Sequence, residues 1–534
     1  MLPLHMKKTS FCILILSFLF VIVNQRAVAG KRCDATQNSE HTCPPQHILP
    51  VDFTHGKVLL ELNQPVVDIK ANDSNDPLMV LPEDRVSISL SLDPGSYTEL
   101  EADWWIVADT PFGLFSYVYP NWEEGFHCCL QAPLNGFSDF SILDSPLPQG
   151  SYSFYFAVDN NADGIADATW GDSIEVHVVP PLKAADDSSV TDRTPLILVH
   201  GNNCESMPCY RWGDYLEKGE QDPEFLDNFK IYLFQWDSSK SNKFNAVALG
   251  TCIDRVQVLN DRKLMILAHS RGGLVSRYFM NDYVTEKGIY SGQPAGERVD
   301  CLITLGTPHR GSPGADPYWS IFSFDCKYQP FLAKQLSLFY LNYIYDPSYN
   351  NLLWNDFENE LTEGPVCWYP SILDSKTEFC STLQSAQSNL DELNNADSYL
   401  NKIIAFGGNE FNEEPFQWGF EWYEHKILSA FSILLAEFPV IPPGYPDTPI
   451  DDRYRPFQAN DGMVPLISAL LLKSGSQGLF TVQNGQLTYD IQELNSQCLL
   501  KKCIVIEDRQ TDHLDFLDDE EIIDLVIRTI KNIE

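Results

Sequence analysis

The sequence predicts an α/β fold, a mostly parallel sheet with a helical cap insertion, preceded by an all-β sandwich. After about residue 195, continuous apolar runs of strand length alternate with helix-like segments, which is typical of a parallel sheet buried on both faces. Before residue 181 the runs are shorter, and Pro, Gly, Asn and Asp separate them about every ten residues, as in a sandwich of antiparallel strands.

Residues 1–29 have the pattern of a secretory signal peptide. Lys7 and Lys8 precede an apolar run over 11–23, and the small residues Ala27 and Ala29 offer a cleavage site before Gly30. The run is too short and wrongly flanked for a membrane span. The sequence shows no second apolar stretch of bilayer length, so we expect an exported protein, extracellular or periplasmic, with no transmembrane segment.

The chain is strongly acidic. Its formal net charge is −38, and removal of residues 1–29, which carry three basic residues and no acidic ones, takes the charge to −41. Such a surface repels nucleic acid and anionic membranes. We therefore expect no nucleic-acid partner, and neutral or cationic substrates.

The cysteines predict local disulfides in an oxidising compartment. Cys12 lies in the signal peptide, which leaves thirteen of the fourteen cysteines in the exported chain. An odd number leaves at least one thiol free, and Cys301, in an apolar strand, is the expected buried one. The pairs close in sequence are Cys33/Cys43, Cys204/Cys209, Cys367/Cys380 and Cys498/Cys503.

Residues 30–181 are expected to form the sandwich, which resembles an immunoglobulin-like accessory domain. A loop within it, residues 159–167, resembles the first nine positions of an EF-hand calcium loop, with Gly164 at the sharp turn. Trp170 stands where the bidentate Glu is expected, so Asp172 would have to replace it. An acidic turn between two strands explains the same residues, and both interpretations stay open. The candidate calcium ligands are Asp159, Asn161, Asp163, Ile165 and Asp167.

Residues 182–194 have the composition of a linker, and residues 195–534 are expected to form the catalytic domain. Two aromatic-rich stretches within 313–455 predict amphipathic helices that cap the carboxyl edge of the sheet, or an extra layer of core helices. The predicted strands are 195–200, 229–234, 264–269, 299–305, 402–406 and 503–507, and the predicted helices include 211–218, 273–285 and 518–532.

The strand predicted over 264–269 leads directly into Ser270, with small residues at Ala268 and Gly272. A strand–nucleophile–helix elbow needs small residues there, because larger side chains collide as the chain reverses. The turn exposes the Ser270 hydroxyl and leaves the Arg271 N–H at a helix N-terminus, where it can stabilise an oxyanion. A tight turn without a catalytic role fits the same pattern, so the other motifs must decide whether Ser270 is a nucleophile.

Three further motifs follow predicted strands. His200-Gly201 precedes a polar loop, and in α/β-hydrolases this loop supplies the second oxyanion N–H, here that of Asn202. Asp461 lies in a turn, and His513 follows the last strand. The order Ser270, Asp461, His513 is the nucleophile–acid–base order of α/β-hydrolases. Each motif alone also fits a packing or turn residue, but all four in this order favour an active site.

These motifs resemble those of the secreted bacterial true lipases of the α/β-hydrolase superfamily, over residues 190–534. The resemblance implies an α/β-hydrolase fold with Ser270 as nucleophile, Asp461 as acid and His513 as base. It also implies Asp515 as a ligand of a structural calcium, because those lipases use the acid two places after the catalytic histidine. Asp461 and His513 lie 52 residues apart, further than in the compact members, with a hairpin-like stretch at 478–500 between them. The motifs are His200-Gly201, 268–272, 306–312, 460–462 and 512–515.

His309 and His269 are the rival bases. We expect His309 to brace the site through Thr307 and Arg310, and His269 to point to the opposite side of the turn.

The predicted function is that of a carboxylic-ester hydrolase, similar to triacylglycerol lipases, that cleaves acylglycerols or other lipid esters through an acyl-enzyme. It needs no cofactor for the chemistry, and contact with a lipid–water interface is transient. A short-chain esterase or a polyester depolymerase is the alternative enzyme. A calcium-dependent surface-binding protein on a hydrolase scaffold is the non-enzymatic alternative, which the intact Ser, Asp and His disfavour.

Overall fold

The computed structural model describes residues 63–167, 169–187, 192–201, 212–238, 240–312, 390, 392–412, 423–436, 457–473 and 479–533. The predicted signal peptide and the first aromatic-rich stretch of the predicted cap, residues 331–345, lie outside these ranges. The described strands up to Val178 and those from Lys183 onward form separate sheets.

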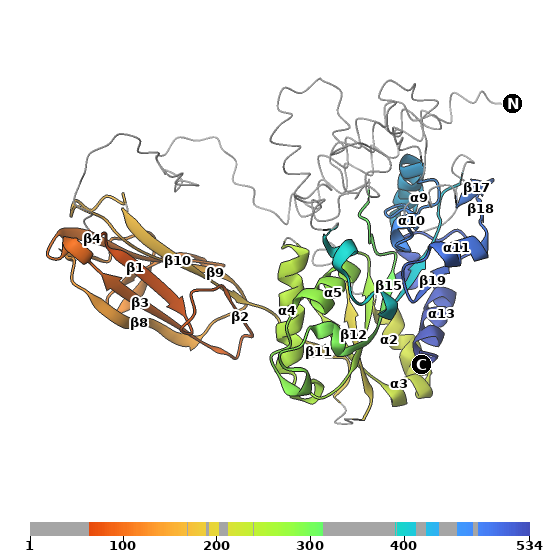
Figure 1. The fold of residues 1–534 in the computed structure, drawn as a ribbon, viewed down its shortest axis with the longest axis horizontal. Helices are drawn as coiled ribbons and strands as arrows, with labels where there is room; N and C mark the ends of the chain where they lie inside the picture. The colour runs from red at the N-terminus through yellow and green to blue at the C-terminus, as the bar shows by residue number, and fades with distance from the viewer. Residues whose placement is uncertain are drawn as a thin grey trace, which may run out of the picture. The chain divides into compact units, whose positions relative to one another are not determined.

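The N-terminal described region is built from two sheets (Figure 1). The neighbours pair antiparallel except β2 and β10, which are parallel. One sheet has the order β1 (Val66–Ala71), β3 (Arg85–Asp93), β8 (Phe137–Pro146). The other has the order β2 (Leu78–Val80), β10 (Trp170–Val178), β9 (Gly150–Val158), β4 (Glu101–Thr110), β5 (Gly113–Val118), β6 (Asn121–Glu124), with β7 (Leu130–Pro133) paired to β4.

Alternation of side chains builds the core of this sandwich. In β3, every second residue is buried, from Val86 to Leu92, as expected for a strand with one face on a core. Side chains from both sheets, such as Ile88 in β3 and Phe156 in β9, belong to the same apolar cluster. The short runs predicted as strands before residue 181 include 86–92, 101–108, 151–158 and 173–179, which coincide with β3, β4, β9 and β10. The immunoglobulin-like assignment stays a prediction.

The second region is a seven-stranded sheet in the order β11-β13-β12-β14-β15-β16-β19. All neighbours are parallel except β11, which is antiparallel to β13. The strands are β11 (Lys183–Ala184), β12 (Thr194–Val199), β13 (Phe229–Phe234), β14 (Leu264–His269), β15 (Val299–Leu305), β16 (Ile403–Gly407) and β19 (Lys502–Val505). The predicted linker thus contributes an edge strand, because the outer edge of β13 is open to pairing.

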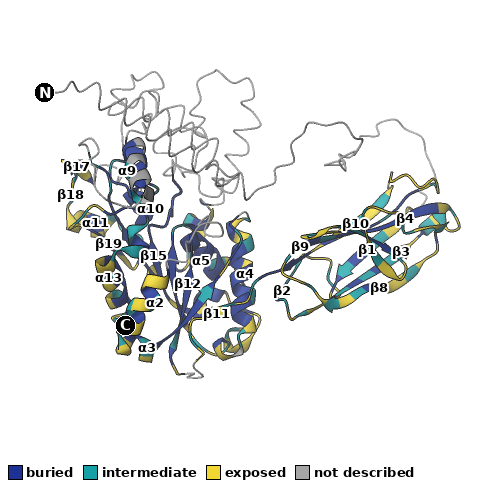
Figure 2. Ribbon diagram, turned by 180° about the vertical axis from the view of Figure 1, so that it is seen from behind, coloured by how far each residue is buried: buried dark blue, intermediate teal, exposed yellow. Residues whose placement is uncertain are grey.

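Helices cover both faces of this sheet (Figures 1 and 2). Ile197 and Ile266 pack in one cluster with residues of α4 (Asn242–Arg255) and α5 (Arg271–Asp282). Their neighbours Leu198 and Leu267 pack in a second cluster with residues of α2 (Trp212–Gln221), α3 (Pro223–Asn228), α12 (Asp515–Asp518) and α13 (Glu520–Lys531). Alternate residues of each strand therefore face opposite helical layers, which explains why these strands are apolar throughout.

The strand predicted over 402–406 is formed, and it divides the predicted cap at 313–455. Residues 403–407 form β16, which is fully buried and pairs with β15 and β19, so this strand belongs to the central sheet. Parallel strands need a crossover connection, and the insertion is therefore divided into a part before β16 and a part after it. The second part includes helix α9 (Tyr423–Ala436), at the place where a helix was predicted from residue 427.

The last part of the chain contains α10 (Leu466–Ala469), the hairpin of β17 (Thr481–Gln483) and β18 (Gln486–Thr488), and α11 (Ile491–Gln497). The hairpin confirms the prediction for 478–500. In the part of the chain that the structure describes, every helix is too short or too polar to cross a membrane.

Candidate active site

Ser270 occupies the turn between β14 and α5 in a conformation that residues other than glycine rarely adopt. Its φ is 53° and its ψ is −132°, and its N–H donates a hydrogen bond to the Leu305 carbonyl at 2.8 Å. A Cβ at Gly272 would lie 2.3 Å from the carbonyl oxygen of His200, so α5 starts too close to β12 for a larger residue. Backbone strain of this kind persists where the surroundings enforce it, and it clusters at functional sites. The turn has the geometry of a nucleophile elbow.

His513 and Asp461 form a buried pair in two different loops. The His513 Nδ1 lies 2.7 Å from Asp461 Oδ2, and the two residues are 6% and 1% exposed. The N–H groups of Met463 and Val464 donate to Asp461 Oδ1 at 2.9 and 2.6 Å, and the His513 N–H donates to the Asp461 carbonyl at 2.9 Å. One carboxylate oxygen is held by the turn, and the other is left to orient the imidazole.

The strand ends bring this pair next to the elbow. Gly306, which follows β15 with φ +54°, passes so close that a Cβ there would lie 2.9 Å from Asp461 Oδ2 and 3.0 Å from His513 Nδ1. Gly201, which follows β12, has the same relation to the elbow: a Cβ there would lie 2.9 Å from the Ser270 Cβ. Bare backbone at these two positions is what lets the side chains of three loops approach one another.

His269 does not point away from the site, and this expectation is wrong. Its ring lies 4.7 Å from the ring of His513, centroid to centroid, and its Nε2 bonds to the His513 carbonyl oxygen at 2.9 Å. Because Nε2 meets a carbonyl, it carries the proton and donates. His269 therefore holds the loop that carries His513, a role that its position in β14 does not reveal.

His309 contacts the predicted partner Thr307, because its backbone N–H donates to the Thr307 carbonyl at 2.8 Å, but the partners of its ring were not predicted. Its Nδ1 lies 3.2 Å from an Arg277 terminal nitrogen and its Nε2 lies 3.1 Å from Thr304 Oγ1. Full burial, and then the charges of Arg277 and Arg310, hold the pKa of His309 well below its ordinary value. Thr307 Oγ1 instead donates to the Ser270 carbonyl at 2.9 Å. A neutral imidazole beside two arginines is a poor proton acceptor.

The N–H of Arg271 opens helix α5 directly after Ser270, where an oxyanion donor is expected. Its predicted partner Asn202 lies outside the described residues. The Arg271 side chain, fully buried, turns away into the protein: it donates to Asn242 Oδ1 at 2.7 Å and to the Ser238 carbonyl at 2.6 Å. The start of α5 is therefore anchored to the segment that leads into α4.

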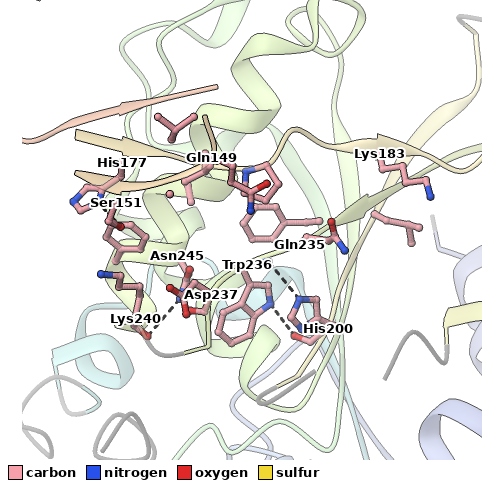
Figure 3. Close-up of a pocket in the computed structure, with 18 of the residues that line it drawn as sticks. Gln149, Ser151, His177, Lys183, His200, Gln235, Trp236, Asp237, Lys240 and Asn245 are labelled. Atoms are coloured by element: carbon pink, nitrogen blue, oxygen red, sulfur yellow. Dashed lines mark hydrogen bonds between the residues drawn. The ribbon is translucent and has the colours of Figure 1, made fainter. Parts of the chain in front are cut away.

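Trp236 links this anchor to His200 (Figure 3). The Arg271 guanidinium lies 5.2 Å from a Trp236 ring centroid, and the indole stacks on His200 with centroids 5.0 Å apart. Burial lowers the pKa of His200 to about 4, so its neutral ring donates through Nδ1 to the Gly201 carbonyl at 2.8 Å. The cavity beside this stack includes none of the three predicted triad residues in its described lining.

Asp515, the predicted calcium ligand, lies in a group with two other potential metal ligands. Ligand atoms of His425, Asp512 and Asp515 all lie within 4.8 Å of one another, and among the described residues this is the group close enough to hold a metal ion. His425, from α9, places its Nδ1 2.6 Å from Asp512 Oδ2 and 3.4 Å from Asp515 Oδ1. Calcium takes roughly six to eight oxygen ligands. With a nitrogen donor facing both carboxylates, the residues do not fit calcium.

The carboxylates in and beside the acidic loop of the sandwich accept hydrogen bonds from the loop itself and from neighbouring strands. Asp159, fully buried, accepts from the Asp103 N–H at 2.8 Å and from Trp105 Nε1 at 3.2 Å. Asp163 accepts from the Ile165 N–H at 2.9 Å, and Asp172 accepts from the Ile69 N–H at 3.1 Å. These contacts are those of a turn, and calcium here stays a prediction.

One predicted disulfide, Cys498–Cys503, is formed, and it joins the end of α11 to β19. The other three predicted pairs lie outside the described residues. Cys301 is buried and free, as predicted, and the other free cysteines of the described part are Cys128, Cys129 and Cys252.

With this geometry established, comparisons with known proteins give the family context. The family model for lecithin:cholesterol acyltransferase matches residues 234–418, which include β14, the elbow and β15. The comparison with curated proteins gave no match.

Among solved structures, the mature lipase BlEst2 of Bacillus licheniformis is 15% identical, covers 66% of this chain and 97% of its own, and has a TM-score of 0.36. Lipase B of Aspergillus fumigatus is 13% identical over 65% of each chain, with a TM-score of 0.25. TM-scores below 0.5 carry no argument about function. The strand order and the family match support the α/β-hydrolase superfamily for the second region; the predicted bacterial true lipases are a narrower group.

Proposed function

We propose that this chain is an exported serine hydrolase that cleaves lipid esters, with Ser270 as nucleophile, His513 as base and Asp461 as the acid that orients it. The proposal rests above all on the buried 2.7 Å contact between His513 Nδ1 and Asp461 Oδ2. With the proton on Nδ1 directed at Asp461, the Nε2 of His513 is the nitrogen that can accept a proton, and this is the tautomer that a serine triad requires.

In this mechanism His513 takes the proton of the Ser270 hydroxyl as its oxygen attacks the ester carbonyl. Asp461 stabilises the imidazolium that forms, and the Arg271 N–H, with the predicted Asn202 N–H, holds the oxyanion. His513 then protonates the leaving alcohol. Water, deprotonated by the same histidine, releases the acid from the acyl-enzyme.

The test is hydrolysis of p-nitrophenyl esters of increasing chain length by the wild type and by Ser270→Ala. We expect the substitution to lower kcat by at least about 10⁴-fold, because the nucleophile is lost. Ser276→Ala is the matched control: this buried serine of α5 donates to the Gly272 carbonyl at 2.8 Å, and its loss is expected to change kcat by less than about tenfold. Full activity of Ser270→Ala contradicts the mechanism. A preference for long acyl chains supports a lipase, and for short chains an esterase.

The family match favours a second candidate, transfer of the acyl group to an alcohol instead of water. The acyl-enzyme is the same, so the two reactions differ only in the acceptor. Vesicles of phosphatidylcholine with cholesterol distinguish them: cholesteryl ester as the main product supports an acyltransferase, and free fatty acid as the main product supports a hydrolase.

A further inference from the structure

Three side chains around the His513 loop present potential metal ligands to one point. Asp512 and Asp515 flank His513 in the sequence, and His425 comes from α9, 87 residues earlier. The Nδ1 of His425 faces both carboxylates, at 2.6 Å from Asp512 Oδ2 and 3.4 Å from Asp515 Oδ1. The set is one imidazole and two carboxylates, assembled from two segments that only the fold brings together.

Further hydrogen bonds and one ion pair orient each of these three ligand side chains. Asp512 Oδ1 accepts from the N–H groups of Leu514 and Asp515 at 2.8 and 3.1 Å, and Asp515 Oδ2 accepts from the Asp512 N–H at 2.6 Å. The other ring nitrogen of His425, Nε2, lies 3.4 Å from Asp518 Oδ2. A histidine that binds a metal through one nitrogen almost always donates the other N–H to a carboxylate or carbonyl. The atoms that face the common point are His425 Nδ1, Asp512 Oδ2 and Asp515 Oδ1, and the first two share a hydrogen bond of 2.6 Å that a metal ion would replace.

The charge of the group also favours a cation. The carboxylates of Asp512, Asp515 and Asp518 all lie within 3.4 Å of the nitrogens of one imidazole, so their negative charges repel one another. A divalent ion would relieve this repulsion. Imidazole nitrogen with carboxylate oxygen is a donor set that suits zinc and similar ions, whereas calcium takes oxygen alone.

We propose that His425, Asp512 and Asp515 form a site for a divalent transition metal of the zinc class, with Asp518 orienting His425. Bonds of about 2.1 Å in tetrahedral geometry place two ligand atoms about 3.4 Å apart, which is the distance between His425 Nδ1 and Asp515 Oδ1. The contact to Asp512 Oδ2 at 2.6 Å must open by less than about 1 Å to reach the same spacing.

A metal here fastens α9 to the loop that carries His513. The sequence predicted calcium near Asp515, whereas the donor atoms here favour a transition metal. The site is argued from its own donors and does not depend on the proposed function. Because α9 belongs to the predicted cap, a bound metal would hold the cap against the loop that carries the proposed base.

The experiment uses the full mature chain in the Ser270→Ala background, so that binding is measured where hydrolysis plays no part. Protein stripped with a chelator and dialysed is titrated with zinc chloride by calorimetry, and bound zinc is measured by mass spectrometry after gel filtration. We expect His425→Asn to bind one zinc fewer per chain than its parent. Asp518→Asn, which keeps all three ligands, is expected to weaken this site by about 10–100-fold.

His177→Asn is the matched control. This buried histidine of the sandwich faces Glu175 at 3.1 Å and lies outside the group, so the zinc binding of the variant should equal that of the parent. The proposal is overturned if the parent binds no zinc, if His425→Asn and Asp518→Asn both bind zinc as the parent does, or if equimolar calcium displaces the zinc. Circular dichroism shows whether each variant is folded, and Asp518→Asn keeps the test decisive should His425→Asn unfold.

Discussion

The loops that follow β15 and β19 each bury a histidine at the carboxyl edge of the same sheet. His513, after β19, faces the carboxylate of Asp461 at 2.7 Å. His309, after β15, faces the guanidinium of Arg277 at 3.2 Å. Both rings are at most 6% exposed, so burial alone does not separate them.

The sign of the neighbouring charge distinguishes the two histidines. A carboxylate stabilises an imidazolium, and a guanidinium opposes it. His513 can therefore accept a proton in the course of a reaction, while His309, with its lowered pKa, serves as a neutral hydrogen-bonding brace. Arg277 in turn is neutralised by Asp397, whose side chain, like that of Arg277, is fully buried, at 2.8 Å. One region suits the proton transfer proposed for His513, and the other is arranged for rigidity.

The largest expected effect is that of Asp461→Asn. The amide keeps the size of the side chain but favours the wrong tautomer of His513, so we expect kcat to fall by about 10⁴-fold. The unfolding midpoint in urea should move little by comparison. Activity within tenfold of the wild type would show that Asp461 is not the acid of the site.

The same substitution in the other region, Asp397→Asn, should do the reverse. It leaves the buried charge of Arg277 without its partner, which costs about 3–5 kcal/mol of unfolding free energy. Urea unfolding measures this cost, and kcat per folded molecule should stay within a few-fold of the wild type. If instead activity is lost while stability is retained, the division between the two regions is wrong.

His309 gives a pH-dependent effect of intermediate size. Its pKa lies well below 6.5 in the folded chain and near 6.5 in the unfolded chain. Below pH 6.5 the unfolded chain therefore binds a proton that the folded chain does not, and the free energy of unfolding falls by about 1.4 kcal/mol per pH unit. Above pH 6.5 the residue contributes no slope.

His309→Gln should remove this contribution. We expect the wild type to lose about 1 kcal/mol more than the variant between pH 6.5 and 5.5, and nearly the same amount as the variant between pH 8 and 7. Equal losses in both intervals would mean that His309 is protonated in the folded state.

The sequence predicted the parts of this edge that depend on local pattern. Apolar runs placed the strands, and the small residues around Ser270 predicted the elbow, because both effects act between near neighbours in the chain. The partners of His309 were not predictable in this way. Arg277 and Asp397 are 120 residues apart, and only the packed sheet determines which charge a buried imidazole meets. The position of His269 against His513, 244 residues away, was missed for the same reason, as was His425 beside Asp515.

The smallest effect tests a direct link between the two regions. Thr307 belongs to the loop of His309, yet its hydroxyl donates to the Ser270 carbonyl at 2.9 Å. Thr307→Val keeps the shape and removes the hydrogen bond, which is worth about 1 kcal/mol, so we expect kcat/KM to fall by roughly fivefold. Thr307→Ser keeps the hydroxyl and should retain most of the activity. If the valine variant is as active as the wild type, the loop after β15 does not help to hold the elbow, and its rigidity serves the fold alone.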